Sequence, residues 1–109
     1  DIIAFQHLVR RVPVADNVVE YAVKLTAKTR PGNNPLANEY LEWGAGPRAS
    51  QFLIVGAKCH ALFRGSYSPD IADVQAIAKP VLRHRLVRNF KAEADAISVD
   101  EVIGKLTAD

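Results

Sequence analysis

The segment GAGPRAS, residues 44–50, combines a glycine-rich turn, a proline and an arginine in an order that suits contact with an anion. Pro47 predicts the first turn of a helix, where free N–H groups and the positive end of the helix dipole attract negative charge. An anion gains about 0.3–1 kcal/mol at such a place, and a cation is disfavoured there. Arg48 therefore either points into solvent or has a negative partner from outside the segment.

Three features favour an outside partner for Arg48. Gly44 and Gly46 predict a flexible loop, the helix start offers unpaired N–H groups, and a guanidinium can bind phosphate through two parallel hydrogen bonds. The opposing interpretation is an exposed arginine that pairs with Glu39 or Glu42 across the turn and contributes little to stability. Both interpretations stay open on the residues alone.

Other familiar catalytic motifs are missing from the sequence. It contains no G-x-x-x-x-G-K-[ST] phosphate loop, no G-x-S-x-G elbow and no H-E-x-x-H pair. Cys59 and His60 are neighbours, but adjacent residues on a helix point about 100° apart and nothing near them completes four metal ligands. We expect a buried thiol beside an imidazole, no bound metal, and no nucleotide held by this chain alone.

The composition predicts one small domain that is held together by packing. The chain has 109 residues, of which 49% are hydrophobic, and a formal net charge of +2. The single cysteine, Cys59, excludes an internal disulfide and a multi-thiolate zinc site. No apolar run approaches the ~20 residues that cross a bilayer and no secretory leader is visible, so we expect a cytoplasmic location. The chain begins with Asp1 and contains no methionine, so we expect it to be the end of a longer chain.

Hydrophobic periodicity predicts an all-α fold, a small bundle of five or six helices. The first helix is expected at residues 2–11 and the second at residues 16–29, with Asp16 as its N-cap. A linker rich in proline, glycine and asparagine follows over residues 30–44 and predicts a loop with one turn at residues 36–41.

The third helix is expected to be central and to run from Pro47 to a stop at Gly65. The sole tryptophan, Trp43, precedes it, and we favour packing in the core over a place at the rim of an interface. The inner face of this helix is predicted to consist of Ala49, Phe52, Leu53, Gly56, Cys59, His60 and Phe63.

Two further helices are expected in the second half of the chain. The sequence SPD at residues 68–70 predicts the start of a fourth helix, which Pro80 should break or kink. Residues 86–96 show no clear period and predict an extended segment or a short hairpin. Ser98 and Glu101 form a capping box for the last helix. Its buried stripe is predicted to be Val102, Ile103 and Leu106.

The run RHRLVRNFK, residues 83–91, carries four cations and no acid. Such a run can contact phosphates, but it can also form a solvated face or a subunit contact. A net charge of only +2 and the lack of a helix-turn-helix pattern argue against nucleic acid, so we favour a subunit contact. The second hypothesis is a stand-alone helical adaptor that binds a protein or nucleic acid through these cations. They are Arg83, Arg85, Arg88 and Lys91.

Three ordered segments of the chain resemble MoxR-type AAA+ ATPases. GAGPRAS is similar to the family's G-A-S-P-R-A segment, with VVEYAVKLTAKTR before it and SPDIADVQAIAKPVLRHRL after it, as in the family. The resemblance covers roughly residues 8–106. It implies that residues 1–109 are the C-terminal lid, a small helical domain that packs over a nucleotide held by a larger α/β domain. The lack of a phosphate loop would then be explained.

In that family, the arginine of the motif is the sensor-2 residue, which reaches the terminal phosphate of ATP. The resemblance carries this catalytic role to Arg48 and implies that Gly46, Pro47 and Arg48 contact the nucleotide. Gly46 departs from the serine that is usual in the family, and the loss of that capping hydroxyl costs only a few tenths of a kcal/mol. VLRHRL, residues 81–86, also matches the family, and we expect a structural or interfacial role for it.

The resemblance also implies cofactors and partners. ATP and Mg²⁺ would be bound mainly by an N-terminal AAA+ domain of the same chain, so we expect the parent protein to be an ATPase and this part alone to be inactive. Neighbouring subunits would form a ring, commonly a hexamer, that acts as a chaperone-like factor in the maturation of other protein complexes. A protein with a von Willebrand A domain is a further expected partner, whereas a membrane or nucleic acid is not.

Overall fold

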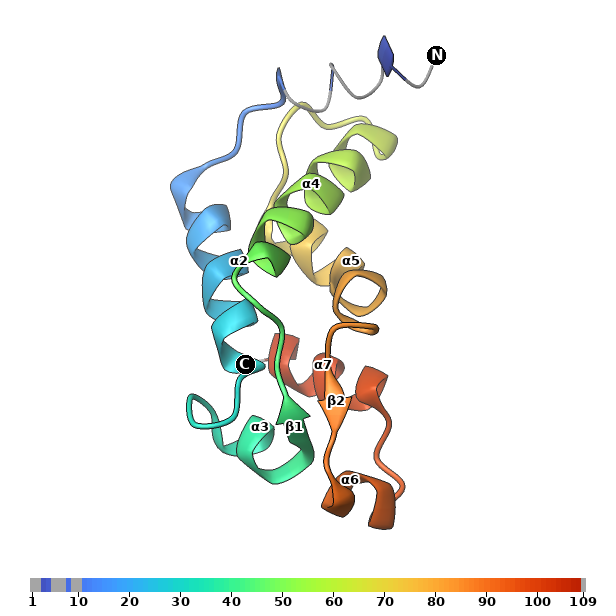
Figure 1. Ribbon diagram of the computed structural model, residues 1–109. Coiled ribbons are helices and arrows are strands. Elements are labelled where there is room, and N and C mark those ends of the chain that lie inside the picture. The colour runs from blue at the N-terminus through green and yellow to red at the C-terminus, as the bar shows by residue number, and fades with distance from the viewer. Residues whose placement is uncertain (1–2, 5–7, 9–10, 109) are drawn as a thin grey trace.

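The computed structural model describes residues 3–4, 8 and 11–108 (Figure 1). The all-α prediction is confirmed, because these residues contain six helices and only one small sheet of two strands. Most of the helix expected at residues 2–11 lies outside the described residues. The elements in chain order are α2 Asp16–Lys28, α3 Pro35–Tyr40, β1 Leu41–Trp43, α4 Arg48–Phe63, α5 Ile71–Leu82, β2 Val87–Arg88, α6 Phe90–Ala94 and α7 Val99–Ala108.

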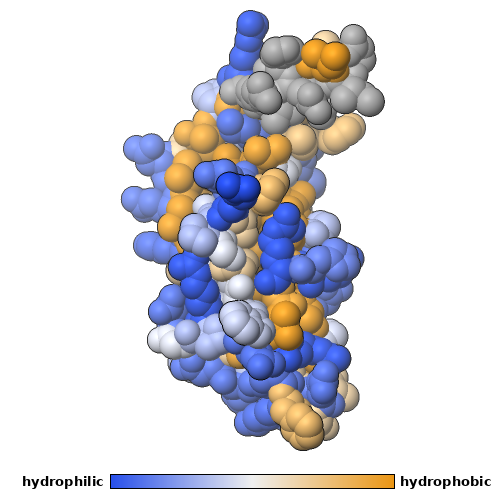
Figure 2. All heavy atoms as spheres, in the orientation of Figure 1, coloured by the Kyte–Doolittle hydropathy of each residue, from blue (hydrophilic) through white to orange (hydrophobic). Residues whose placement is uncertain are grey.

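Helix α4 lies at the centre of the packing, against α2 on one side and α5 on the other, and α7 packs on α5 and α2 (Figure 1). The sheet and the short helices α3 and α6 lie together at the lower end of the molecule in this view. Figure 2, in the same orientation, shows hydrophobic side chains beside the upper part of α2 and hydrophilic side chains with a few hydrophobic ones among them below. Among the described residues, none of the helices combines the length and apolar character needed to cross a membrane.

The inner face of α4 differs from the predicted one. Buried alanines at positions 49, 57 and 61 flank Leu53, and this spacing of four residues forms one stripe that lets neighbouring helices approach closely. Phe52 and Phe63 were expected inside but have exposed fractions of 44% and 83%. Cys59 and His60 are half-buried. The prediction assigned the aromatic residues to the core, whereas the helix buries its smallest side chains.

The linker predicted as a loop with one turn at residues 36–41 contains α3, close to the place of that turn, and also β1. Asn34 caps α3, since its side-chain oxygen accepts a hydrogen bond from the Leu36 amide at 2.9 Å, and Pro35 occupies the first turn. Strand β1 then pairs antiparallel with β2. The extended structure expected at residues 86–96 is confirmed only for the two residues of β2, because α6 occupies Phe90–Ala94 and no hairpin forms there.

Trp43 is 65% exposed, so the prediction that it packs in the core is wrong. Leu41 of the same strand is only 2% exposed. Residues two apart in a regular strand share a face, but the pairing of β1 with β2 shifts register between Leu41 and Trp43. The irregularity separates the two side chains, and Leu41 takes the core position.

Helix α5 begins later and ends later than expected. Asp70 is its N-cap and forms a capping box with Asp73, in place of the predicted start at Ser68. Pro80 does not break the helix, because the Arg83 amide donates to the Lys79 carbonyl at 2.8 Å and regular hydrogen bonding resumes beyond the proline. The last residue of the helix is fully buried, which favours its continuation.

The ends of α2 and α7 are close to the predicted ones. Ala15 is the N-cap of α2, so Asp16 lies in the first turn, where its charge suits the helix dipole. At the start of α7, the Ser98 hydroxyl accepts a hydrogen bond from the Glu101 amide at 3.1 Å, as the capping box predicted. The predicted buried stripe of α7 is confirmed at Val102, Ile103 and Leu106.

A buried carboxylate connects the C-terminal end of α4 to the start of α5. Asp73 is 1% exposed and accepts two hydrogen bonds of 2.8 Å from the Arg64 guanidinium. His60 Nδ1 lies 2.6 Å from the same carboxylate, and the Asp70 amide donates to it at 2.7 Å. The bonds from Arg64, with help from Asp70 and His60, hold the pKa of Asp73 well below its ordinary value of 3.8, although burial opposes this shift.

We predict that Asp73→Asn lowers the free energy of unfolding by about 1.5–3 kcal/mol at neutral pH, because charge-assisted hydrogen bonds are lost. Since the pKa of Asp73 is lowered in the folded state, its contribution is complete above 3.8 and shrinks as the pH falls below that value. Urea unfolding between about pH 4 and about pH 2 should therefore show a weaker acid dependence in the variant.

Glu20→Gln, at an exposed carboxylate of α2, is the matched control and should stay within about 0.5 kcal/mol of the wild type. The interpretation is wrong if Asp73→Asn loses stability toward acid as steeply as the wild type does.

Candidate functional site

The residues of the predicted anion site lie together at the start of α4. Gly46, Pro47 and Arg48 are all exposed. Pro47 has helical dihedral angles, φ −58° and ψ −29°, so the helical conformation starts there as predicted and the regular helix begins at Arg48. The Ala49 and Ser50 amides donate to the Gly46 and Pro47 carbonyls at 3.0 and 3.2 Å, so two N–H groups that were expected to be free are already used.

The Arg48 side chain forms no hydrogen bond or ion pair with any residue in the described part of the chain. The alternative that it pairs with Glu39 or Glu42 is wrong: Glu39 instead contacts the Lys91 ammonium at 2.7 Å. The guanidinium of Arg48 is therefore exposed and available to a group from outside these residues. A guanidinium carries five donors that suit the oxygens of a phosphate.

The loop before α4 is tightly held against the end of α2. A Cβ atom at Gly44 would lie 2.4 Å from the Thr29 carbonyl oxygen, so glycine is required for this close approach. The Ala45 amide donates to the Thr29 hydroxyl at 2.9 Å, and the Ala45 carbonyl accepts from Arg30 Nε at 3.1 Å. Gly44 is thus a packing residue rather than the flexible spacer that we expected.

Gly46 differs from Gly44, because no atom lies within 4 Å of the position that its Cβ would occupy. The serine that is usual in the resembling family would fit there. The prediction missed the roles of Thr29 and Arg30, because it treated Thr29 only as the end of a helix and Arg30 only as the start of the linker. The available signal was a threonine directly after an amphipathic helix, where a side-chain hydroxyl commonly bonds to nearby backbone groups.

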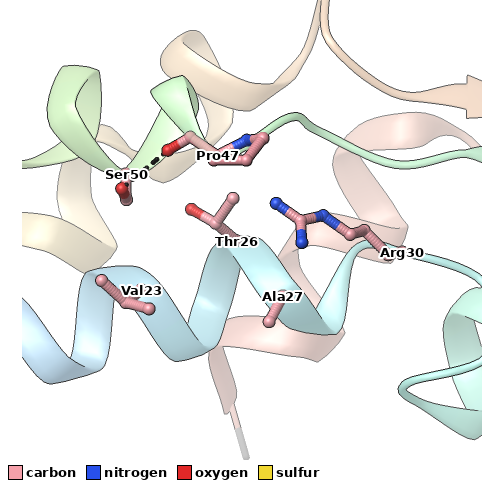
Figure 3. Close-up of a pocket in the computed structure, with 6 residues that line it drawn as sticks. All are labelled: Val23, Thr26, Ala27, Arg30, Pro47 and Ser50. Atoms are coloured by element: carbon pink, nitrogen blue, oxygen red, sulfur yellow. Dashed lines mark hydrogen bonds between the residues drawn. The ribbon is translucent and has the colours of Figure 1, made fainter.

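A pocket of about 180 Å³ lies between α2 and the first turn of α4 (Figure 3). Ligand sites for drug-sized molecules typically measure about 300–1,000 Å³, so this pocket is too small to enclose a nucleotide. Arg30 is the one charged residue that lines it, and its guanidinium points toward the turn that contains Pro47. The lining residues are Val23, Thr26, Ala27, Arg30, Pro47 and Ser50.

The basic segment 83–91 is largely occupied by contacts within the domain. Arg83 pairs with Asp100 at 2.8 Å, and Lys91 pairs with Glu39. Arg88 donates to the Ile97 carbonyl at 3.0 Å, and the Arg85 guanidinium lies 4.6 Å from the ring centre of Phe52. These contacts favour a structural role for the segment over an open surface that binds phosphates.

The histidine next to Cys59 also has a structural role in this domain, because His60 contacts Asp73 in the junction of α4 and α5. The thiol of Cys59 is half-buried rather than buried as expected. Among the described residues, no three histidine, cysteine, aspartate or glutamate side chains lie close enough together to hold a metal ion.

Comparison with known proteins relates this chain to AAA+ proteins. A family model described as the AAA lid domain matches residues 34–106. The chaperone MoxR1 of Mycobacterium tuberculosis is 35% identical over 109 residues, which cover 97% of this chain and 29% of that protein. The uncharacterized protein YeaC of Bacillus subtilis is 29% identical over 108 residues, which cover 97% of this chain and 31% of YeaC.

A solved protein structure has the same fold as this chain. The crystal structure of a candidate ATPase from Cytophaga hutchinsonii superimposes with a TM-score of 0.89 at 24% sequence identity, over 98% of this chain and 33% of the other. The chain thus spans about a third of the length of the proteins that it matches.

The two glycines of the loop yield a direct test of the contact with α2. We predict that Gly44→Ala lowers the free energy of unfolding by about 1–3 kcal/mol, because the methyl group forces the loop away from Thr29. Gly46→Ser should raise it by a few tenths of a kcal/mol, because the serine hydroxyl can cap the helix. Chemical denaturation measures both. Equal stability of Gly44→Ala and the wild type would contradict the close contact.

Proposed function

This chain belongs to the AAA lid domain family, and we propose that it acts in a MoxR-type AAA+ ATPase as the lid whose Arg48 contacts the terminal phosphate of bound ATP. The observation that carries this proposal is the state of Arg48. It stands at the start of α4 within the segment that resembles the family motif, it is exposed, and it forms no ion pair with any described residue.

The residues at the start of α4 can contact a phosphate, but they cannot enclose a whole nucleotide. Arg48 can donate two parallel hydrogen bonds to phosphate oxygens, and α4 turns its positive dipole end in the same direction. The pocket beside it is too small for a nucleotide, and the described residues offer no group of carboxylates for Mg²⁺. We therefore propose that ATP and Mg²⁺ are held by the remainder of a longer chain.

Arg48 would act by electrostatic stabilisation. In phosphoryl transfer, negative charge spreads over the oxygens of the transferred group, and a positioned arginine stabilises that charge without reorganisation. Because Arg48 belongs to the lid, its contact with the phosphate would also make the position of the lid depend on whether the terminal phosphate is present. This second effect couples the nucleotide to movement of the domain.

We also propose the assembly and role of the complete protein. MoxR1, one of the relatives, is named a chaperone. By analogy, the parent protein would assemble into a ring, commonly a hexamer, and assist the maturation of other protein complexes, with a von Willebrand A domain protein as one partner.

Replacement of Arg48 by alanine in the full-length protein tests the proposal. We expect ATP turnover to fall by about 10³-fold or more, because a charge that stabilises the transferred phosphoryl group is lost. The melting temperature should stay unchanged, since Arg48 is exposed and has no partner in the domain. Arg48→Lys should retain more turnover than Arg48→Ala, because lysine keeps the positive charge. It should stay below the wild type, because lysine cannot donate two parallel hydrogen bonds to the phosphate.

The control is Lys105→Ala, which removes another exposed cation, on α7. It should leave ATP turnover at the wild-type rate. The proposal fails if Arg48→Ala hydrolyses ATP as fast as the control does.

A further inference from the structure

Two side chains at the end of α2 form hydrogen bonds with the backbone N–H and C=O groups of Ala45, which lies three residues before Arg48. The Thr29 hydroxyl accepts the Ala45 N–H at 2.9 Å, and Arg30 Nε donates to the Ala45 carbonyl at 3.1 Å. Ala45 is only 1% exposed, so these backbone groups depend on partners from the protein. We call Thr29, Arg30, Gly44 and Ala45 the α2 clamp.

The Thr29 hydroxyl in the α2 clamp has a defined orientation. It is fully buried, and it donates its own hydrogen to the Thr26 carbonyl at 2.7 Å while it accepts from Ala45. Both functions of the hydroxyl are therefore used. The backbone of Gly44 packs closely on the Thr29 carbonyl, because a Cβ at this position would lie 2.4 Å from the carbonyl oxygen. This contact sets the position of the loop on α2.

Beyond Ala45, the start of α4 lies partly apart from α2. The pocket of about 180 Å³ separates Val23 and Ala27 of α2 from Pro47 and Ser50 (Figure 3). Gly46 has open space where a side chain would project. The first turn of α4 is anchored by the buried Ala49 on its inner side and by the α2 clamp on the other. The direction in which the exposed Arg48 leaves the domain therefore depends on the clamp.

We propose that Thr29 and Arg30 are positioning residues, which act through Ala45 to fix the place of Arg48. This inference rests on the proposed function of Arg48. Thr29→Val keeps the shape of the side chain but leaves the Ala45 amide buried without a partner, and such an amide turns toward water or a new acceptor. The peptide groups that lead to Arg48 shift with it.

The first measurement is hydrogen exchange of residues 44–48 in the full-length protein, which tests the clamp without reference to activity. We expect exchange at Ala45 to become about tenfold faster in Thr29→Val, because its hydrogen bond is lost. Thr29→Ser retains the hydroxyl and should restore slow exchange. Unchanged exchange at Ala45 in Thr29→Val overturns the proposal at once.

The second measurement is ATP turnover. Thr29→Val and Arg30→Ala should each lower kcat by about 10- to 100-fold, with a smaller change in KM. The reason is that a displacement of about 1 Å at a group that acts on the substrate can lower the rate by that factor. The matched control is Thr26→Val, which alters a second buried threonine of α2 whose hydroxyl bonds to Ala22 within the same helix. It should leave kcat unchanged, as should Thr29→Ser.

The double variants separate a positioning role from general damage. In the Arg48→Ala background, Thr29→Val should cause no further loss of kcat, since the residue that it positions is gone. If Thr29→Val lowers kcat in this background by the same factor as in the wild type, the positioning proposal is overturned, while the proposed function of Arg48 is not affected. If Arg48→Ala alone leaves turnover unchanged, the proposed function fails, and the positioning role fails with it, whatever the exchange data show about the clamp.

Discussion

The buried amide of Ala45 must have a hydrogen-bond partner, and the way in which it is satisfied places α4 against α2. A backbone N–H away from water is costly when it is unpaired, so the loop before α4 depends on the side chain that accepts this bond. Thr29 provides the acceptor, and the glycine at position 44 allows the two backbones to come close enough. The first turn of α4, with the exposed Arg48, follows from this contact.

The opposite end of α4 is held by a second buried polar contact, of a different kind. Asp73 on α5 accepts hydrogen bonds from Arg64 and lies beside His60 of α4, so the two helices cannot separate without leaving a buried carboxylate unpaired. Between these two contacts, α4 packs through a stripe of three alanines and Leu53, and the alanines allow close approach of the neighbouring helices. The polar contacts at both ends of α4 thus add to the apolar packing along its length.

Local signals in the sequence predicted much of the fold, and contacts between distant segments explain what was missed. The buried stripe and capping serine of α7 follow from residues within one helix. The exposed side of Trp43 could not be predicted, because it depends on a register shift in a pairing with residues more than forty positions later. The same holds for Gly44, whose need for glycine arises from Thr29, fifteen residues earlier. The candidate site at Arg48 follows from a local motif and stays a prediction, whereas the contacts of Thr29 and Arg30 with Ala45 join distant segments and were missed.

The most direct test of the account is a structure of the full-length protein with Mg²⁺ and a non-hydrolysable ATP analogue. The account predicts that the Arg48 guanidinium lies within about 2.7–3.2 Å of an oxygen of the terminal phosphate, with the Ala45 bonds to Thr29 and Arg30 intact. A terminal phosphate that is contacted only by other residues, while Arg48 points into solvent, would contradict it.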